Sequence, residues 1–288
     1  MAITIDLVHD WEDIQLDTFR EFIAKWGFES KTLKRYLKAS HGTEEYDGAR
    51  EDALVIWFNY LHRLIPAKPR KLLSNPSLVC PPEVMQGWAM LQQEVKDGVD
   101  LTPRLSRMIE NGDYNDGMLY DWGFHHFHLG TTADPKHPRL IQGTKIVLVA
   151  HVNALEFCPI DFVPHNQWGD KSILERAILA FPNQFERYLV KGVTDSTSIC
   201  ANKEVLENLR KCGTNCIHKI GNRLYFPPGR GVTTAGTGVR ATILLDQSRR
   251  RLRKLEGQLG EMLNAQQCSG EVRLVRFQSA EDSCGEHG

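Results

Sequence analysis

The sequence predicts an α+β protein in which a helical N-terminal part is followed by an antiparallel sheet flanked by helices. Two observations lead to this fold class. Up to about residue 111, apolar side chains recur at the three- and four-residue spacing of amphipathic helices. Beyond residue 116, short apolar runs follow one another through short links, which favours antiparallel strands.

The change of character falls at turn-forming residues between positions 111 and 117. We therefore predict a helical domain or layer over residues 1–115 and a histidine-containing α+β domain over residues 116–278. Residues 279–288 are predicted to be a disordered tail. A chain of 288 residues has room for one large domain or two ordinary ones.

The N-terminal part is predicted to contain helices at residues 17–26, around 33–37, at 49–64 and from 82 to about 98. The helix at 49–64 has apolar side chains on most sides, so we expect it in the centre of the core. Pro66 ends it, because proline removes a backbone donor. A further short helix is expected at Thr102, with Pro103 in its first turn.

The second part is predicted to contain strands at residues 124–129, 145–152, 156–163, 187–193 and 272–277, and helices at 171–181, 203–211 and 239–262. Gly221 and Asn222 are typical of a hairpin turn between residues 216–220 and 223–226. The helix at 239–262 carries leucines at a and d spacing, and we expect Leu252 and Leu255 to face inward. It could pack against the rest of the protein or against a second copy in a homo-oligomer.

Composition excludes several classes of protein. Charged residues make up 25%, apolar residues 41%, and the formal net charge is -1, so no overall charge marks a nucleic-acid or membrane binder. No apolar run approaches the roughly 18 residues of a membrane span. We therefore expect a cytoplasmic protein with no membrane partner. Any polyanion contact must come from a local patch such as the basic run 249–254.

The histidines are the main functional signal. Six of the eleven lie between His125 and His165. Alternate side chains of a strand share a face, so His126 and His128 should point one way while His125 joins the packed side. His151 and His165 end the next two predicted strands. The sheet would then gather three or four imidazoles on one surface.

Two kinds of chemistry fit such a cluster. In the first, imidazoles perform general acid and base work without a metal, and RNA cleavage suits this well. In the second, His126, His128, His151 and His165 supply ligands for zinc or another divalent metal, which leaves a position for water. The carboxylates that we consider near the cluster in sequence are Asp121 and Asp161. We favour the metal-free site and expect no cofactor, with zinc as the alternative.

A glycine- and threonine-rich loop at 229–238 precedes the long C-terminal helix. Glycines let a backbone present N–H groups, and a helix start adds a positive dipole end, so the composition indicates anion binding. The loop has neither the ending of a P-loop nor the spacing of a dinucleotide fingerprint. The residues expected to bind phosphate are Arg230, Thr233, Thr234, Gly236 and Arg240.

Strands that end in Ala150-His151 and Pro164-His165, a helical layer and clustered histidines resemble the small metal-independent ribonucleases, a group that includes RelE-type toxins, barnase and EndoU-type enzymes. The resemblance covers residues 118–245 at most. It implies cleavage of RNA to a 2′,3′-cyclic phosphate, often in toxin or anti-phage roles.

The leading hypothesis is therefore a metal-independent endoribonuclease, with His126 and His128 as acid and base and with His151 and His165 assisting. One alternative is a divalent-metal hydrolase. Another is a non-catalytic module that binds nucleic acid or a second subunit through the basic, leucine-bearing C-terminal helix.

Overall fold

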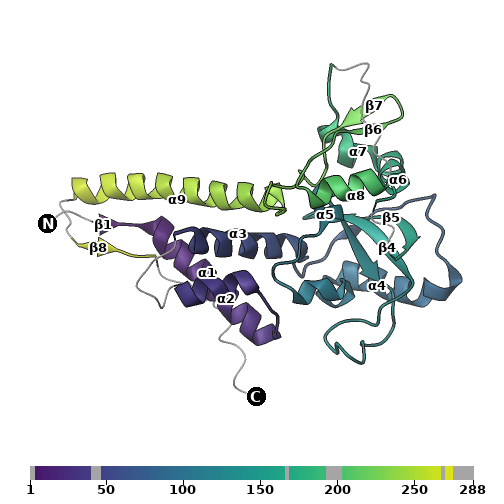
Figure 1. Ribbon diagram of the computed structural model, residues 1–288, viewed down its shortest axis with the longest axis horizontal. Helices are drawn as coiled ribbons and strands as arrows, with labels where there is room; N and C mark the ends of the chain where they lie inside the picture. Colours follow the sequence, from purple (N-terminus) through teal and green to yellow (C-terminus); the bar gives the residue numbers. More distant parts are fainter. Residues whose placement is uncertain (1–3, 40–46, 166–168, 193–202, 267–269, 275–288) are drawn as a thin grey trace.

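The computed structural model describes residues 4–39, 47–165, 169–192, 203–266 and 270–274. It confirms the α+β class (Figure 1). The N-terminal helices are α1 (Leu7–Trp26), α2 (Lys31–Ala39), α3 (Asp47–Arg63) and α4 (Met85–Asp97), followed by α5 (Gly117–Trp122). The later ones are α6 (Ser172–Ala180), α7 (Pro182–Phe185), α8 (Lys203–Lys211) and α9 (Val239–Ala265). Short 3₁₀ turns η1 to η4 lie at Pro82–Val84, Thr102–Arg104, Arg107–Glu110 and Glu186–Tyr188.

The largest sheet of the described residues has four strands, in the order β2-β5-β4-β3. Its strands are β2 (Lys71–Leu72), β3 (Phe124–His128), β4 (Ile146–Val152) and β5 (Glu156–Pro164). The predicted antiparallel meander is confirmed, because β3 pairs with β4 and β4 with β5 in antiparallel fashion. The register sets His126 opposite Val149 and His128 opposite Val147. β3 is an edge strand, so its side chains and its free edge can both face cavities.

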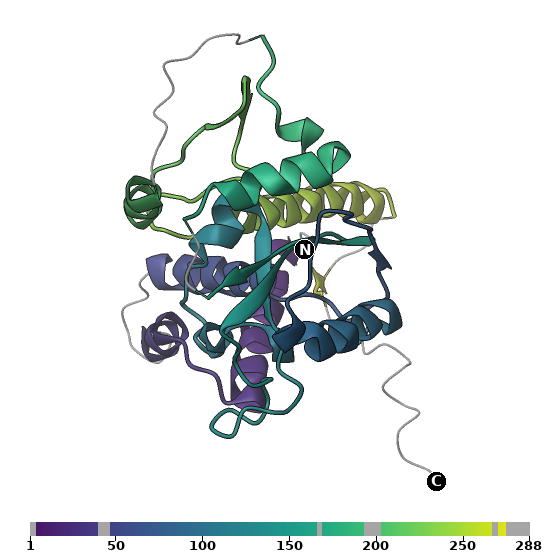
Figure 2. The same cartoon turned by 90° about the vertical axis from the view of Figure 1, so that its right-hand side faces the viewer.

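Two hydrophobic clusters cover the two faces of this sheet. One joins α1, α3 and α4 with Phe127, Leu148 and Phe157 of the sheet and with Leu245 of α9. The other joins Val147 and Val149 with α6, α7 and α8. In the view turned by 90°, the teal strands lie between the green helices and the purple and blue ones (Figure 2). The first cluster crosses residue 115, and the division into domains stays a prediction.

The helix α3 is the centre of the N-terminal core, as predicted. Leu54 and Tyr60 are fully buried, and Trp57 stacks on Phe19 of α1 with ring centroids 4.9 Å apart. The helix α1 begins ten residues earlier than predicted. The Asp6 side chain accepts a hydrogen bond from the amide of His9 at 2.9 Å and so caps the earlier start.

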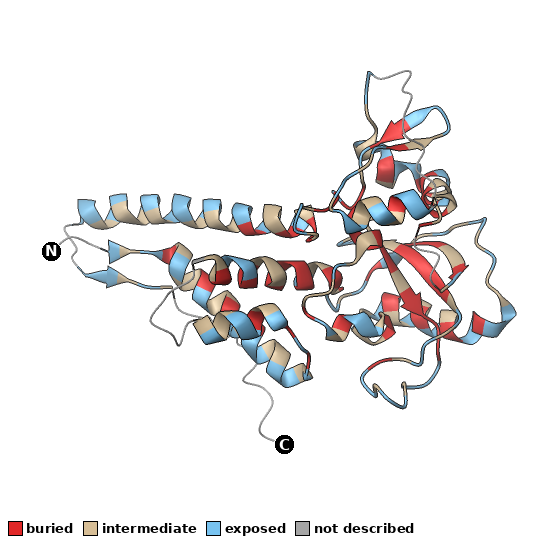
Figure 3. Ribbon diagram, in the orientation of Figure 1, coloured by how far each residue is buried: buried red, intermediate tan, exposed pale blue. Residues whose placement is uncertain are grey.

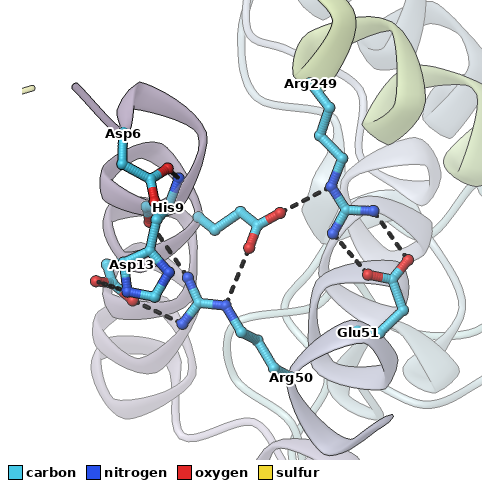
Figure 4. A network of polar contacts seen from close by, with 7 residues as sticks. Asp6, His9, Asp13, Arg50, Glu51 and Arg249 are labelled. Atoms are coloured by element: carbon cyan, nitrogen blue, oxygen red, sulfur yellow. Dashed lines mark hydrogen bonds and ion pairs between the residues drawn. The ribbon is translucent and has the colours of Figure 1, made fainter. Parts of the chain in front are cut away.

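The long helix α9 lies alongside α3 and reaches the small parallel sheet of β1 (Thr4–Ile5) and β8 (Glu271–Val272) (Figure 1). Two ion pairs of Arg249 attach it to α1 and α3. Glu12 of α1 accepts from Arg50 of α3 at 3.0 Å and from Arg249 of α9 at 2.7 Å, and Arg249 also pairs with Glu51 (Figure 4). Arg249 therefore connects helices and is not free for a polyanion.

The outer half of α9 has protein on one side only, and its residues are mostly exposed or half-buried (Figure 3). Leu255, which the leucine spacing predicted to face inward, is 47% exposed. That prediction is wrong because the helix extends past α3. Contact with a second copy through this helix stays a prediction.

Three predicted elements need correction. The helix at Thr102 is a single 3₁₀ turn, since Leu105 is already extended. Residues 187–192 form no strand: η4 ends at Tyr188, and Leu189 makes one isolated bridge to Tyr225. The strand predicted at 272–277 is β8, which ends at Val272 within the described residues. Three predicted pieces lie outside the described residues: the rest of this strand from residue 275, residue 193 of the strand predicted at 187–193, and the tail 279–288.

The hairpin predicted at Gly221 and Asn222 is confirmed as β6 (His218–Ile220) and β7 (Arg223–Tyr225). Among the helices of the described residues, none combines the length and the apolar character that crossing a membrane requires.

Candidate functional site

Strand β3 separates its histidines as the alternation predicted. His125 is 8% exposed and lies 6.3 Å, between ring centroids, from the buried Phe127. His126 and His128 point to the other face, which Val147 and Val149 share. Because these two positions are two residues apart in a strand, their rings lie side by side, with centroids 6.1 Å apart.

The third imidazole comes from the end of β5. The amide of His165 donates to the carbonyl of Lys145 at 2.7 Å, which holds His165 beside the start of β4. Its ring centroid lies 5.9 Å from that of His126 and 5.3 Å from that of His128. One nitrogen of each ring lies within 4.8 Å of those of the other two. We call His126, His128 and His165 the histidine triad.

Thr144 fixes the orientation of His128. Its backbone amide donates to Nδ1 of His128 at 3.1 Å. Its hydroxyl donates to the carbonyl of Ile146 at 2.6 Å and accepts from the amide of Leu129. Since Nδ1 accepts a hydrogen bond, the neutral ring carries its proton on Nε2. His128 is therefore held as an N–H donor through Nε2.

His126 and His128 are kept neutral near pH 7. Burial, and next to it the neighbouring imidazoles, lowers the pKa of His126 to about 3 and that of His128 to about 4. His165 is the most exposed of the three. Neutral imidazoles can accept protons, donate N–H hydrogen bonds or bind metals. A negatively charged ligand would favour the protonated forms.

A cavity of about 530 Å³ lies at the free edge of β3 and is lined by His126. Its other walls come from α5, α8 and the loop at 232–236, and include Arg210, Lys211 and Asp116. Burial raises the pKa of Asp116, whose carboxylate accepts from the amide of Leu119 at 3.0 Å. Lys211 is exposed and, among the described residues, forms no ion pair.

Arg210 is held by a buried carboxylate. Asp121 accepts from Nε of Arg210 at 3.0 Å and pairs with His218 at 2.8 Å, and the guanidinium lies 4.3 Å from the ring centroid of Trp122. Burial alone would raise the pKa of Asp121, but these two partners hold it below its usual range. Asp121 therefore positions a cation in the wall of the cavity beside His126. It does not belong to the triad, and Asp161 pairs with Arg176 instead.

Not all the expected site residues meet. His151 lies four residues along β4 from Val147, the partner of His128, and thus about 13 Å away. Its Nδ1 donates to the carbonyl of Gly123 at 3.1 Å. Arg230 and Arg240 line a cavity together with His151 and not with the triad.

The glycine-threonine loop is also divided. The hydroxyls of Thr233 and Thr237 bond each other at 2.8 Å, and Thr233 lines a separate cavity near α3. Thr234 is exposed, and Gly236 lines the cavity beside His126. The amide of Gly238 donates to Asn59 and that of Val239 to Gly231. The helix start is thus already bonded within the protein.

Sequence reasoning missed Thr144, Arg210 and Lys211. No short-range pattern marks them, because their relation to the triad depends on how the 130–144 loop and α8 fold back. Asp121 and His218 are 97 residues apart, so their pairing had no local signal either. No protein-family model, no curated protein and no solved structure matches this chain.

Proposed function

We propose that the histidine triad is the acid/base centre of a metal-independent endoribonuclease. The convergence of His126, His128 and His165 carries this proposal. No cysteine, aspartate or glutamate among the described residues joins the group, so the triad offers neither thiolate nor carboxylate. RNA brings its own nucleophile, the 2′-hydroxyl. A cluster made only of imidazoles therefore suits RNA as substrate.

The steps follow from proton positions. A neutral imidazole of the triad, His126 or His165, takes the proton of the 2′-hydroxyl while the 2′-oxygen attacks phosphorus. The bond from phosphorus to the 5′-oxygen breaks, and that oxygen receives the Nε2 proton of His128 in its imidazolium form, which the bound phosphoryl group favours and which returns to the neutral imidazole. The products are a 2′,3′-cyclic phosphate and a 5′-hydroxyl. The negative phosphoryl group raises the pKa of the nearby imidazoles during the reaction.

The surroundings supply what the reaction also needs. A cation close to the triad stabilises charge that develops on the phosphoryl oxygens, and Arg210 and Lys211 line the cavity that contains His126. A volume of about 530 Å³ has room for a nucleotide beside His126, the one member of the triad that lines this cavity. Toxin and defence roles depend on this activity and stay predictions.

The test uses purified full-length chain, RNA and a chelator. We expect cleavage that leaves cyclic phosphate ends and that His128→Ala abolishes. His9→Ala is the matched control, because His9 is exposed on α1 far from the sheet. Cleavage that survives His128→Ala, or that fails in chelator and returns with a metal, would contradict the proposal.

A second candidate, a divalent-metal hydrolase, is favoured by the same three nitrogens within 4.8 Å, since three histidines are a known zinc ligand set. His128 fits it less well. A metal-bound imidazole normally donates from its other nitrogen, whereas Nδ1 of His128 accepts from Thr144. Elemental analysis of untagged protein decides: one equivalent of metal, lost in His126→Ala, supports the metal centre.

A further inference from the structure

Two adjoining cavities lie toward the opposite end of β3 from the triad. Their volumes are about 230 Å³ and 280 Å³, and they share His151, Asn153, Tyr188 and Arg240 among their walls. We call this pair the basic cleft. It is formed where α3, the start of α9 and the segment 184–188 meet the end of β4.

The lining of the basic cleft carries positive charge only. Its cationic residues are Lys68, Arg70, Arg187, Arg230 and Arg240. Among the described residues that line it there is no aspartate or glutamate. In a chain of net charge -1, five cations around one cleft without a counter-charge need an explanation. Like charges repel, so gathering them costs free energy that a bound anion would recover.

These cations differ in how they are held. Arg70 donates to the carbonyls of Pro66, Lys68 and Asn153, so it builds the wall. The side chains of Arg187, Arg230 and Arg240 make no hydrogen bond or ion pair within the part of the chain that the structure describes. Their guanidinium groups are therefore available to a ligand. Glu156, whose charge acts on His151, is bonded to the side-chain amides of Asn153 and Gln184.

The backbone at Arg230 supports a role for its side chain. Arg230 has φ 77°, and no other non-glycine residue of the described chain has a positive φ. Both neighbours are glycines for steric reasons: a Cβ on Gly229 would lie 2.2 Å from the carbonyl oxygen of Leu119, and one on Gly231 2.1 Å from Asn215. Glycine would suit position 230 as well, yet arginine stands there. Such strain is found most often at functional sites.

A buried polar atom also faces this region without a partner. Nδ1 of His62, which lines the cleft, is buried and has no hydrogen-bond partner among the described residues. Its ring stacks on Tyr120 with centroids 5.9 Å apart. Buried polar atoms are nearly always satisfied by protein, water or ligand.

We propose that the basic cleft binds a phosphate-bearing ligand, at a site separate from the histidine triad. Guanidinium groups match phosphate oxygens in paired hydrogen bonds, and Arg187, Arg230 and Arg240 approach the cleft from three different segments. Tyr188 and Leu244 give it an apolar side that suits a base or sugar. The phosphate can belong to a small nucleotide or to a nucleic acid.

The test measures binding to the full chain by calorimetry. The probes are inorganic phosphate, 5′-AMP and a short single-stranded RNA. Arg240→Gln removes the cation and keeps a polar side chain. Arg230→Gly removes the second cation and also relieves the strained backbone at that position. Arg250→Gln is the control, because its side chain is 77% exposed on the outer part of α9. Because each substitution removes one hydrogen bond to a charged group, we expect the Kd of the probe to rise by about 10- to 100-fold.

Saturable binding of phosphate or 5′-AMP that weakens in Arg240→Gln and Arg230→Gly, but not in Arg250→Gln, supports a small-ligand site. Binding of RNA alone with the same pattern supports the site with a nucleic acid as the source of the phosphate. The absence of binding by every probe, or equal binding by all variants, overturns the proposal. His128→Ala should keep the binding, so this outcome is independent of the proposed ribonuclease activity.

Discussion

The two ends of β3 hold histidines in opposite situations. At the triad end, the neighbours of His126 and His128 are other imidazoles, and Nδ1 of His128 accepts from the amide of Thr144. At the other end, His151 donates from Nδ1 to the carbonyl of Gly123, and arginines surround it. The triad end of β3 thus has N–H donors among imidazoles, whereas the other end has a cleft lined by cations.

The difference shows that a residue type does not determine its chemistry. The sequence alone grouped His126, His128, His151 and His165 with Arg230 and Arg240. Backbone groups and neighbouring charges divide them into a place suited to proton transfer and a place suited to anions. The following predictions test that division, from the largest expected effect to the smallest.

The first prediction compares histidines of the two ends. His128→Ala should lower the rate of RNA cleavage by about 100- to 10,000-fold, the range for loss of one proton-transfer group. His151→Ala should leave the chemical step unchanged, because His151 lies outside the triad. Single-turnover cleavage of a labelled oligonucleotide measures both. Equal losses in the two variants would mean that the ends form a single site.

The second prediction concerns the carboxylate that holds Arg210 beside the triad. Asp121→Asn should lower the free energy of unfolding by about 3–5 kcal/mol, because it leaves a buried guanidinium without its counter-charge. Asp161→Asn is the matched change in a half-exposed pair with Arg176 and should cost about 0–1 kcal/mol. Urea unfolding measures the two. A similar loss of unfolding free energy in the two variants would show that Asp121 does not stabilise a buried guanidinium.

How far the sequence could predict these features depends on their range. Alternation in β3 predicted that His126 and His128 share a face, and short links predicted the meander that brings His165 near. The two-residue strands β1, β2 and β8 have no periodicity to detect, and their partners are distant in sequence. The position of Arg210 depends on a contact with Asp121 across 89 residues. Local sequence patterns therefore predicted helices and strands. The cavities are formed by contacts between residues far apart in the sequence, which those patterns do not detect.

The third prediction uses pH at the basic end. Burial, and next to it the charge of Arg240, lowers the pKa of His62 to about 3, while an unfolded histidine has a pKa near 6.5. The unfolded chain therefore binds a proton that the folded one does not, and stability falls as pH drops below about 6.5. His62→Gln should remove about 2 kcal/mol of the loss between pH 7 and pH 5. Urea unfolding of both proteins at the two pH values measures this loss. If His62→Gln loses as much stability between pH 7 and pH 5 as the original chain, His62 is exposed to water.

The fourth and smallest effect tests whether strain at Arg230 is kept for binding. Without a ligand, Arg230→Gly should raise the free energy of unfolding by up to about 1 kcal/mol, because glycine adopts φ 77° without a steric penalty. Arg230→Ala should bring no such gain, since alanine keeps a Cβ. Urea unfolding in phosphate-free buffer measures both. If Arg230→Gly also weakens phosphate binding, Arg230 is retained for the ligand at a cost in stability. If Arg230→Gly instead destabilises the fold, the Arg230 side chain contributes to packing and the backbone strain has a structural cause.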